Sequence, residues 1–123
     1  MQREIKFRGK DIKNNWHYGL LAHNKRKDKH YEWFISNSVG EAYAYGVIKE
    51  TIGQFTGLYD KNGKDIFEGD ILDTSDGYAV VEHSPYDGGW DVKFSDGGII
   101  GISEIIKSLV VAGNIYENPE LLK

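Results

Sequence analysis

Histidines are the residues of this sequence that most readily bind metals, and three of the four lie close together. His17 and His23 fall in a stretch of alternating polarity, and His30 follows in a basic segment. A histidine-only zinc site needs about three ring nitrogens at roughly 2.0–2.1 Å from the ion. The spacing of these histidines matches no known metal motif, and exposed histidines on a polar face are the more common arrangement. We therefore expect neither a bound metal nor any other cofactor.

Two segments resemble loops that bind ions or phosphates, but their spacing does not fit. In residues 60–70, DKNGKDIFEGD, lysine stands at the fifth position and glycine at the fourth. An EF-hand calcium loop needs an oxygen ligand at the fifth position and glycine at the sixth. A β-turn explains Asn62-Gly63 better, because both residues tolerate positive φ. Gly53 and Gly57 lie near threonines, but they lack the Walker spacing of a phosphate loop.

The sequence contains no familiar catalytic arrangement. Glu68 and Asp70 would share one face of a strand, yet a general acid–base pair needs one raised pKa, and solvated carboxylates are the more common case. No serine stands in a G-x-S-x-G context. The chain has no cysteine, which excludes disulfides, thiol nucleophiles and Cys-ligated zinc. A hydrolase that uses His17, His23 or these carboxylates ranks last among the hypotheses, and we expect no enzyme.

The basic N-terminal part of the chain contains the strongest candidates for a binding surface. Cations there are interleaved with aromatic residues: Arg8, Lys10 and Lys13 with Trp16, Tyr18 and Tyr31. Cations beside exposed aromatic rings hold single strands or nucleotides in β proteins. The alternation of Trp16 and Tyr18 favours the other interpretation, in which these rings belong to the core.

Two polar residues of an apolar block add to this candidate surface. Gln54 and Thr56 flank Phe55, and they could either satisfy backbone groups of an irregular strand or line a site. The complete candidate surface consists of Arg8, Lys10, Lys13, Trp16, His17, Tyr18, Gln54 and Thr56.

Short segments of alternating polarity, separated by turn residues, predict the elements that must position these side chains. The expected strands span residues 3–8, 16–23, 31–36, 43–50, 51–59, 66–72, 78–83, 90–94 and 108–116. Trp90, Val92 and Phe94 are expected on a buried face. A serine at 103 could cap a short helical turn over 103–107, and Asn118-Pro119 predicts a terminal helical turn over 118–122.

This pattern predicts a mainly β protein, because short strands at close spacing favour a small barrel or sandwich. The 123 residues are enough for one domain of the usual size of about 100–150 residues. We expect a single domain over 1–123 with two parts. Residues 1–57 would form an N-terminal β lobe, and residues 58–123 an SH3-like barrel lobe that ends in the short C-terminal helical turn.

Charge and hydropathy indicate the cellular environment and the kinds of partner to expect for the protein. No apolar run approaches the ~18–20 residues of a membrane span, and the charged N-terminus has no signal-peptide core. We therefore expect a cytoplasmic protein with no membrane partner. The net charge of −4 argues against a general nucleic-acid coat, but the charge is uneven, with +5 over residues 1–35 and −9 over residues 36–123. Such asymmetry can mark an interaction surface or steer subunits together.

Four sequence blocks in order carry a family resemblance: REIKFRGK near the start, WHYG at 16–19, TIGQFTGLYDKNGKDIFEGDIL at 51–72 and GNIYENPELL at 113–122. This combination is similar to the YopX family of bacteriophage and prophage proteins. The resemblance implies a compact β fold with an SH3-like portion, a bacterial host cytoplasm and, in some members, self-association into a homo-oligomer. The family is one of unknown function, so the resemblance transfers no functional residue.

Two hypotheses of function follow. The first is a non-enzymatic binding module for a host or phage macromolecule, either a protein or a nucleic acid. The alternative is a small-ligand binder that sequesters a nucleotide in counter-defence. Structural self-assembly is a further reading, because a strand-rich chain with lobes of opposite charge could form closed rings. The sequence determines neither the partner nor the oligomeric state.

Overall fold

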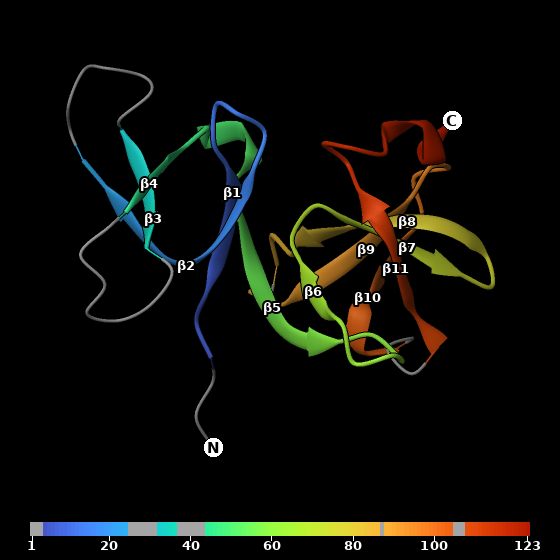
Figure 1. The fold of residues 1–123 in the computed structure, drawn as a ribbon. Helices are drawn as coiled ribbons and strands as arrows, with labels where there is room; N and C mark the ends of the chain where they lie inside the picture. Colours follow the sequence, from blue (N-terminus) through green and yellow to red (C-terminus); the bar gives the residue numbers. More distant parts are fainter. Residues whose placement is uncertain (1–3, 25–31, 37–43, 87, 105–107) are drawn as a thin grey trace. The chain divides into compact units, whose positions relative to one another are not determined.

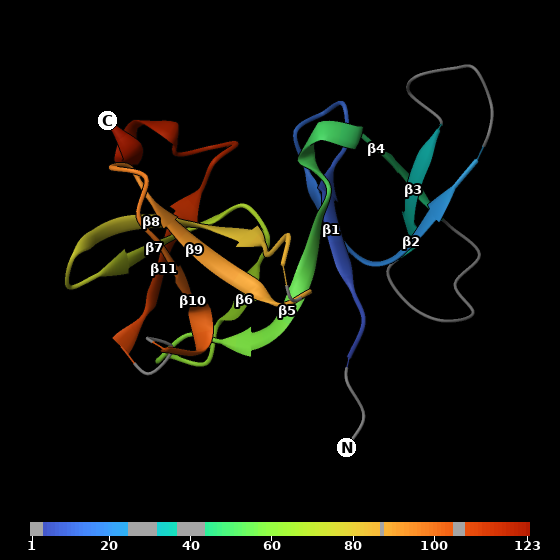
Figure 2. The same ribbon diagram turned by 180° about the vertical axis from the view of Figure 1, so that it is seen from behind.

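The computed structural model describes residues 4–24, 32–36, 44–86, 88–104 and 108–123. Within these residues the chain consists of short antiparallel strands joined by turns and short 3₁₀ helices (Figure 1, and Figure 2 from behind). It divides into two compact units, Met1–Phe55 and Thr56–Lys123. The prediction of a mainly β protein is confirmed.

In the first unit, the first four strands form a meander in which each strand pairs with the next one along the chain, and the fifth strand pairs with the first. Its elements are β1 (Phe7–Lys10), β2 (Trp16–His23), β3 (Trp33–Ser36), β4 (Tyr45–Val47), η1 (Lys49–Thr51) and the start of β5 (Gly53–Tyr59). The strand order in this unit is β4-β3-β2-β1-β5, and the sixth strand of the sheet, β6 (Asp65–Phe67), pairs with β5 in the second unit. The strand β1 therefore pairs with β2 on one side and with the beginning of β5 on the other.

One face of this sheet carries the core of the first unit. Ile35 is fully buried, and Val47 is 2% exposed. A Cβ on Gly9 would lie 3.0 Å from the Cβ of Val47, so glycine permits this close packing. The backbone N–H of Ile48 donates to the carbonyl of Lys10 at 2.8 Å. The chain that follows β4 is thereby tied back to β1.

Asp11 organises the turn between β1 and β2. Its Oδ1 accepts hydrogen bonds from the backbone N–H groups of Lys13 and Asn15, both at 2.9 Å. Between them, Asn14 adopts a φ of 72°, a left-handed conformation that asparagine tolerates better than most residues. The turn therefore fixes the register of the first hairpin, in which Lys10 pairs with Trp16.

The second unit contains an antiparallel sheet of five strands in the order β10-β9-β8-β7-β11. The five strands of this sheet are β7 (Asp70–Thr74), β8 (Gly77–His83), β9 (Trp90–Phe94), β10 (Ile99–Gly101) and β11 (Val110–Asn114). The unit also contains the end of β5, β6 (Asp65–Phe67), η2 (Ile102–Glu104) and η4 (Pro119–Leu122). Buried side chains from several of these elements form one cluster: Ile66, Leu72, Ala79, Val81, Val92, Ile102 and Leu109.

The predicted turn at Asn62-Gly63 is present and is held by Asp60. Gly63 has a φ of 82°. Oδ1 of Asp60 accepts the backbone N–H groups of Asn62 and Lys64 at 2.8 and 2.9 Å. Its Oδ2 accepts the N–H of Val111 at 3.0 Å. One buried carboxylate thus joins the turn that precedes β6 to the last strand of the unit.

The predicted SH3-like barrel is not observed, because among the described strands the five-stranded sheet stays open, with β10 and β11 at its edges. On its side away from β7, β11 meets the Asp60 turn, where the N–H of Lys61 donates to the carbonyl of Leu109 at 3.0 Å. The register of β11 also shifts between Val111 and Gly113. β10 has only three residues. The short β10 and the irregular β11 thus lie at opposite edges of the sheet and do not pair with each other, so the sheet does not close into a barrel.

Most expected strands are present with shifted ends. β2 has the predicted bounds, and so does β9, whose Val92 is fully buried while Trp90 and Phe94 pack against the same core. The first strand begins at Phe7 rather than at residue 3. β10 was not expected from the sequence. The terminal helical turn is present as η4, whereas most of the turn expected over 103–107 lies outside the described residues.

Membrane insertion through a helix finds no support. None of the described helical segments is long or apolar enough to cross a bilayer.

Candidate functional site

Two of the three basic residues proposed from the sequence, Arg8 and Lys10, lie on one face of β1 in the first unit. Arg8 and Lys10 are two residues apart, so their side chains point to the same face. The register places Tyr18 opposite Arg8 and Trp16 opposite Lys10. Four of the eight candidate residues therefore gather on one sheet face.

Both cations of this group are buried and contact the Trp16 ring. Arg8 is 5% exposed, and its guanidinium carbon lies 4.9 Å from the ring centroid. Lys10 is 6% exposed, with its Nζ 5.3 Å from the same centroid. The Lys10 ammonium also donates to Oδ1 of Asn14 at 2.6 Å. Cation–π contacts of this kind stabilise the local packing. Arg8 and Lys10 therefore have a structural role in the first unit.

The remaining candidates of the first unit are more dispersed. Lys13 is exposed in the β1–β2 turn, and Tyr18 is 45% exposed. His17 pairs with Gly9, and Gln54 pairs with Phe7. By strand alternation, His17 and Gln54 therefore lie on the face opposite to Arg8. His17 and Gln54 therefore share no sheet face with the two cations, whereas Tyr18 lies on their face, opposite Arg8.

Thr56 has a structural role in the second unit. It is 7% exposed. Its hydroxyl donates to the carbonyl of Ile66 at 2.8 Å and accepts the N–H of Leu58 at 3.1 Å. Of the two alternatives left open by the sequence, satisfaction of backbone groups at the irregular strand accounts for this residue.

His17 is held by a carboxylate and an aromatic ring. Its Nε2 is hydrogen-bonded to Oδ2 of Asp11 at 2.8 Å, and its ring stacks on Tyr45 with centroids 4.1 Å apart. The hydrogen bond from His17 lowers the pKa of Asp11; burial opposes this shift, and the turn N–H groups add to it. A second pair joins His23 and Glu32 at 2.9 Å. Among the described residues, no three His, Asp or Glu side chains are arranged to hold a metal ion.

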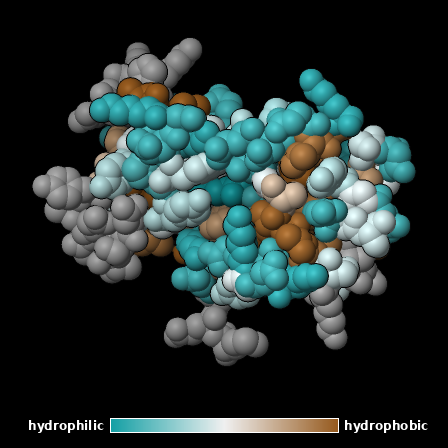
Figure 3. Space-filling view, turned by 45° about the vertical axis from the view of Figure 1, so that its right-hand side comes forward, coloured by the Kyte–Doolittle hydropathy of each residue, from teal (hydrophilic) through white to brown (hydrophobic). Residues whose placement is uncertain are grey.

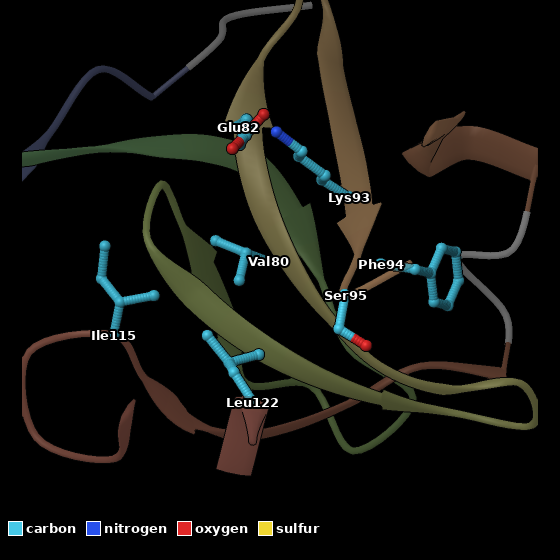
Figure 4. A pocket seen from close by; sticks show the side chains of 7 residues that line it. All are labelled: Val80, Glu82, Lys93, Phe94, Ser95, Ile115 and Leu122. Atoms are coloured by element: carbon cyan, nitrogen blue, oxygen red, sulfur yellow. The ribbon is translucent and has the colours of Figure 1, made fainter. Parts of the chain in front are cut away.

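A groove that the sequence did not indicate runs along the outer face of the five-stranded sheet in the second unit. Its volume is about 460 Å³, and it is lined by Val80, Glu82, Lys93, Phe94, Ser95, Ile115 and Leu122 (Figure 4). An adjoining hollow of about 370 Å³ shares Val80, Glu82 and Ile115 and extends past Glu68 and Tyr116.

Strand alternation determines which side chains face the groove. On β8, Ala79 and Val81 point into the core and are 0% and 1% exposed, so Val80 and Glu82 point outward. On β9, the register sets Lys93 beside Val80. The groove floor is therefore formed by the outward residues of two paired strands.

The C-terminal segment supplies the apolar wall. The N–H of Ile115 donates to the carbonyl of Gly69 at 3.0 Å. Oδ1 of Asn114 accepts the N–H of Tyr116 at 3.0 Å, which tightens the turn after β11. A Cβ on Gly113 would collide with the Asn118 side chain, so this turn closes only over glycine. It is followed by η4, which carries Leu122.

The groove combines apolar and charged parts. Val80, Ile115 and Leu122 gather in one region, and the Lys93 ammonium points toward Glu82 in another (Figure 4). On the face of the molecule seen in Figure 3, apolar side chains reach the surface in patches bordered by polar ones. A concave site with apolar walls and a few charged groups is the usual form of a binding site.

Comparison with known proteins identifies the family. A family model described as YopX protein matches residues 6–123. The chain belongs to the YopX family. A crystal structure of protein EF1440 from Enterococcus faecalis is similar, with a TM-score of 0.58 and 27% sequence identity over 99% of this chain and 100% of that one. No curated protein matches the chain.

The sequence blocks that indicate the YopX family have structural tasks in this member. The block at 51–72 includes Asp60 and its turn, and the block at 113–122 forms the wall of the groove. The groove was missed because its residues come from three separate parts of the sequence. The apolar residues among the turn-forming ones in GNIYENPELL are the signal that could have indicated it, because apolar side chains beside a tight turn must pack on a neighbouring element.

Proposed function

We propose that this YopX-family protein is a non-enzymatic binding module that holds an extended segment of a partner protein in the groove of its second unit. The observation that carries the proposal is the apolar wall of Val80, Ile115 and Leu122 on the outer face of the sheet. The solvated face of an antiparallel sheet is normally polar. Apolar groups that persist there within a hollow are typical of an interface.

The groove has dimensions and composition that suit a peptide segment. Its volume of about 460 Å³ lies within the range of roughly 300–1,000 Å³ of known ligand sites. Its charged groups, Glu82 and Lys93, are exposed and border the apolar part. An apolar centre with a polar rim is the arrangement found in protein–protein interfaces.

Nucleotide binding by the first unit receives less support. Base stacking requires an accessible aromatic face, and the Trp16 ring is already contacted by Arg8 and Lys10. The buried position of these two cations also leaves less charge for a phosphate group. We therefore favour the protein partner over the nucleotide.

We further propose that the protein is encoded by a bacteriophage or prophage and acts in the cytoplasm of the bacterial host, where its partner is a host or phage protein. Self-association into a homo-oligomer is part of this proposal. Family membership supports these statements, and the opposite net charges of residues 1–35 and 36–123 would favour contacts between copies.

Selection from a random peptide library tests the function. Wild-type protein should enrich peptides that lose binding to Val80→Arg, because arginine would fill the groove with charge. Ile12→Arg is the matched control, since it adds the same charge to an isoleucine that is 65% exposed in the first unit. Peptides that bind both variants equally, or no enrichment at all, would refute a binding role for the groove.

A further inference from the structure

Two outward residues of β8 divide the groove into an apolar and an acidic subsite. Val80 and Glu82 are two positions apart, which along a strand is about 6.6–6.8 Å. An extended peptide laid on the sheet has the same period, so its side chains at positions i and i+2 would meet these two residues in turn. The groove can therefore distinguish peptides by the pair of side chains at that spacing.

The apolar subsite surrounds Val80. Ile115 and Leu122 border it from the C-terminal segment, and Lys93 is its cross-strand neighbour. The Lys93 ammonium points away toward Glu82 (Figure 4), so the aliphatic stem of this lysine adds to the wall, as lysine stems commonly do. An aliphatic side chain of the size of leucine suits such surroundings.

The acidic subsite lies at Glu82. The register sets Asp91 directly opposite Glu82 on the same face, and like charges in that position repel each other. Glu68 lines the adjoining hollow together with Glu82. Glu82 and Asp91 thus place two carboxylates on this face, and the neighbouring Lys93 supplies one ammonium, which points toward Glu82 (Figure 4). The excess of negative charge over residues 36–123 acts in the same direction.

We propose that the groove is selective for an extended peptide in which an aliphatic residue and a lysine or arginine are two positions apart. This inference rests on the proposed binding function and adds the chemistry of the partner segment. The aliphatic side chain would enter between Val80, Ile115 and Leu122, and the cation would meet Glu82 and Asp91. Charge complementarity of this kind mainly determines which partners are accepted.

Three synthetic peptides test the selectivity. The first is acetyl-Gly-Ser-Gly-Leu-Thr-Lys-Gly-Ser-Gly-amide, the second replaces lysine by glutamate, and the third moves lysine one position further from leucine. We expect the first to bind about tenfold more tightly than the second, since attraction is replaced by repulsion at a partly solvated site. The third should bind more weakly than the first. Affinities are measured by titration into isotope-labelled protein with detection by NMR.

A variant shows whether the preference comes from the acidic subsite. Glu82→Gln combined with Asp91→Asn should reduce the preference for lysine over glutamate to about twofold or less, while Glu50→Gln, an exposed carboxylate of the first unit, should leave it unchanged. Equal binding of the lysine and glutamate peptides in the groove would overturn the selectivity but leave the binding function intact. The selectivity is also overturned, and the binding function kept, if these peptides do not bind but the library yields peptides of another pattern that bind in the groove. If the synthetic peptides do not bind and the library yields no groove-dependent peptide, the binding function and the selectivity are both overturned.

Discussion

Replacement of Asp60 should destabilise the second unit more than any change of an exposed carboxylate. Asp60 is 6% exposed and accepts three backbone hydrogen bonds, from Asn62, Lys64 and Val111. A hydrogen bond to an ionised group contributes about 1.5–3 kcal/mol. Water can replace the carboxylate at the exposed turn residues, whereas the N–H of Val111 lies in a strand and loses its partner. We therefore expect Asp60→Ala to lower the free energy of unfolding by about 3 kcal/mol.

Asp60→Asn separates the charge from the geometry. Its amide oxygen can still accept from Asn62 and Lys64, but its NH₂ group would face the N–H of Val111. We expect the free energy of unfolding, measured by urea unfolding at neutral pH, to fall by about 2 kcal/mol. Asp73→Asn, an exposed carboxylate of β7, is the matched control and should change stability by less than about 0.5 kcal/mol.

The dependence on pH gives a second, independent check. Burial raises the pKa of Asp60, but the three N–H donors, Val111 first, outweigh it, and the pKa in the folded protein is lower than usual. The stabilisation is therefore complete above the unfolded pKa of about 3.9 and is lost as pH falls through the folded value. The difference between wild type and Asp60→Asn should shrink below about pH 4. Equal stability at pH 7, or a difference that persists in strong acid, would refute the role of Asp60.

Further predictions concern both units. Gly9→Ala should lower the free energy of unfolding by about 1–3 kcal/mol through overpacking, since its Cβ would lie 3.0 Å from that of Val47. Thermal unfolding of the double variant Gly9→Ala, Val47→Ala should show a smaller loss of stability than the sum of the two single variants. Gly113→Ala should displace Asn118 and weaken peptide binding by NMR titration, and retained full affinity would contradict the role of this turn. Asp11→Asn should destabilise the protein above about pH 4 but not in strong acid, because the folded pKa of Asp11 is lowered; a urea series over pH that shows no such convergence would contradict this.

Local patterns in the sequence predicted most of the elements. Alternation gave the bounds of β2 and the buried face of β9, and Asn62-Gly63 indicated its turn because two adjacent residues there tolerate positive φ. β10 has three residues between a glycine-rich turn and η2, too few to show a period. Sheet closure depends on edges far apart in the sequence, so the open arrangement could not be deduced.

The candidate site was harder to predict, because burial and pairing are tertiary properties. Arg8 and Lys10 count as charges in the sequence, and only the paired strands show that both lie on Trp16. The groove brings β8 and β9 together with a C-terminal segment that carries Ile115. Its parts have no common sequence motif, although the family block at 113–122 contains one wall.

We propose above all that the groove of the second unit binds an extended segment of a partner protein. NMR titration of the leucine–lysine peptide into isotope-labelled protein tests it most directly, with Val80→Arg as the blocked variant. We expect saturable shifts at Val80, Ile115 and Leu122 that are absent in the variant. Shifts confined to Trp16 and Tyr18 of the first unit, or identical titrations of both proteins, would contradict the claim.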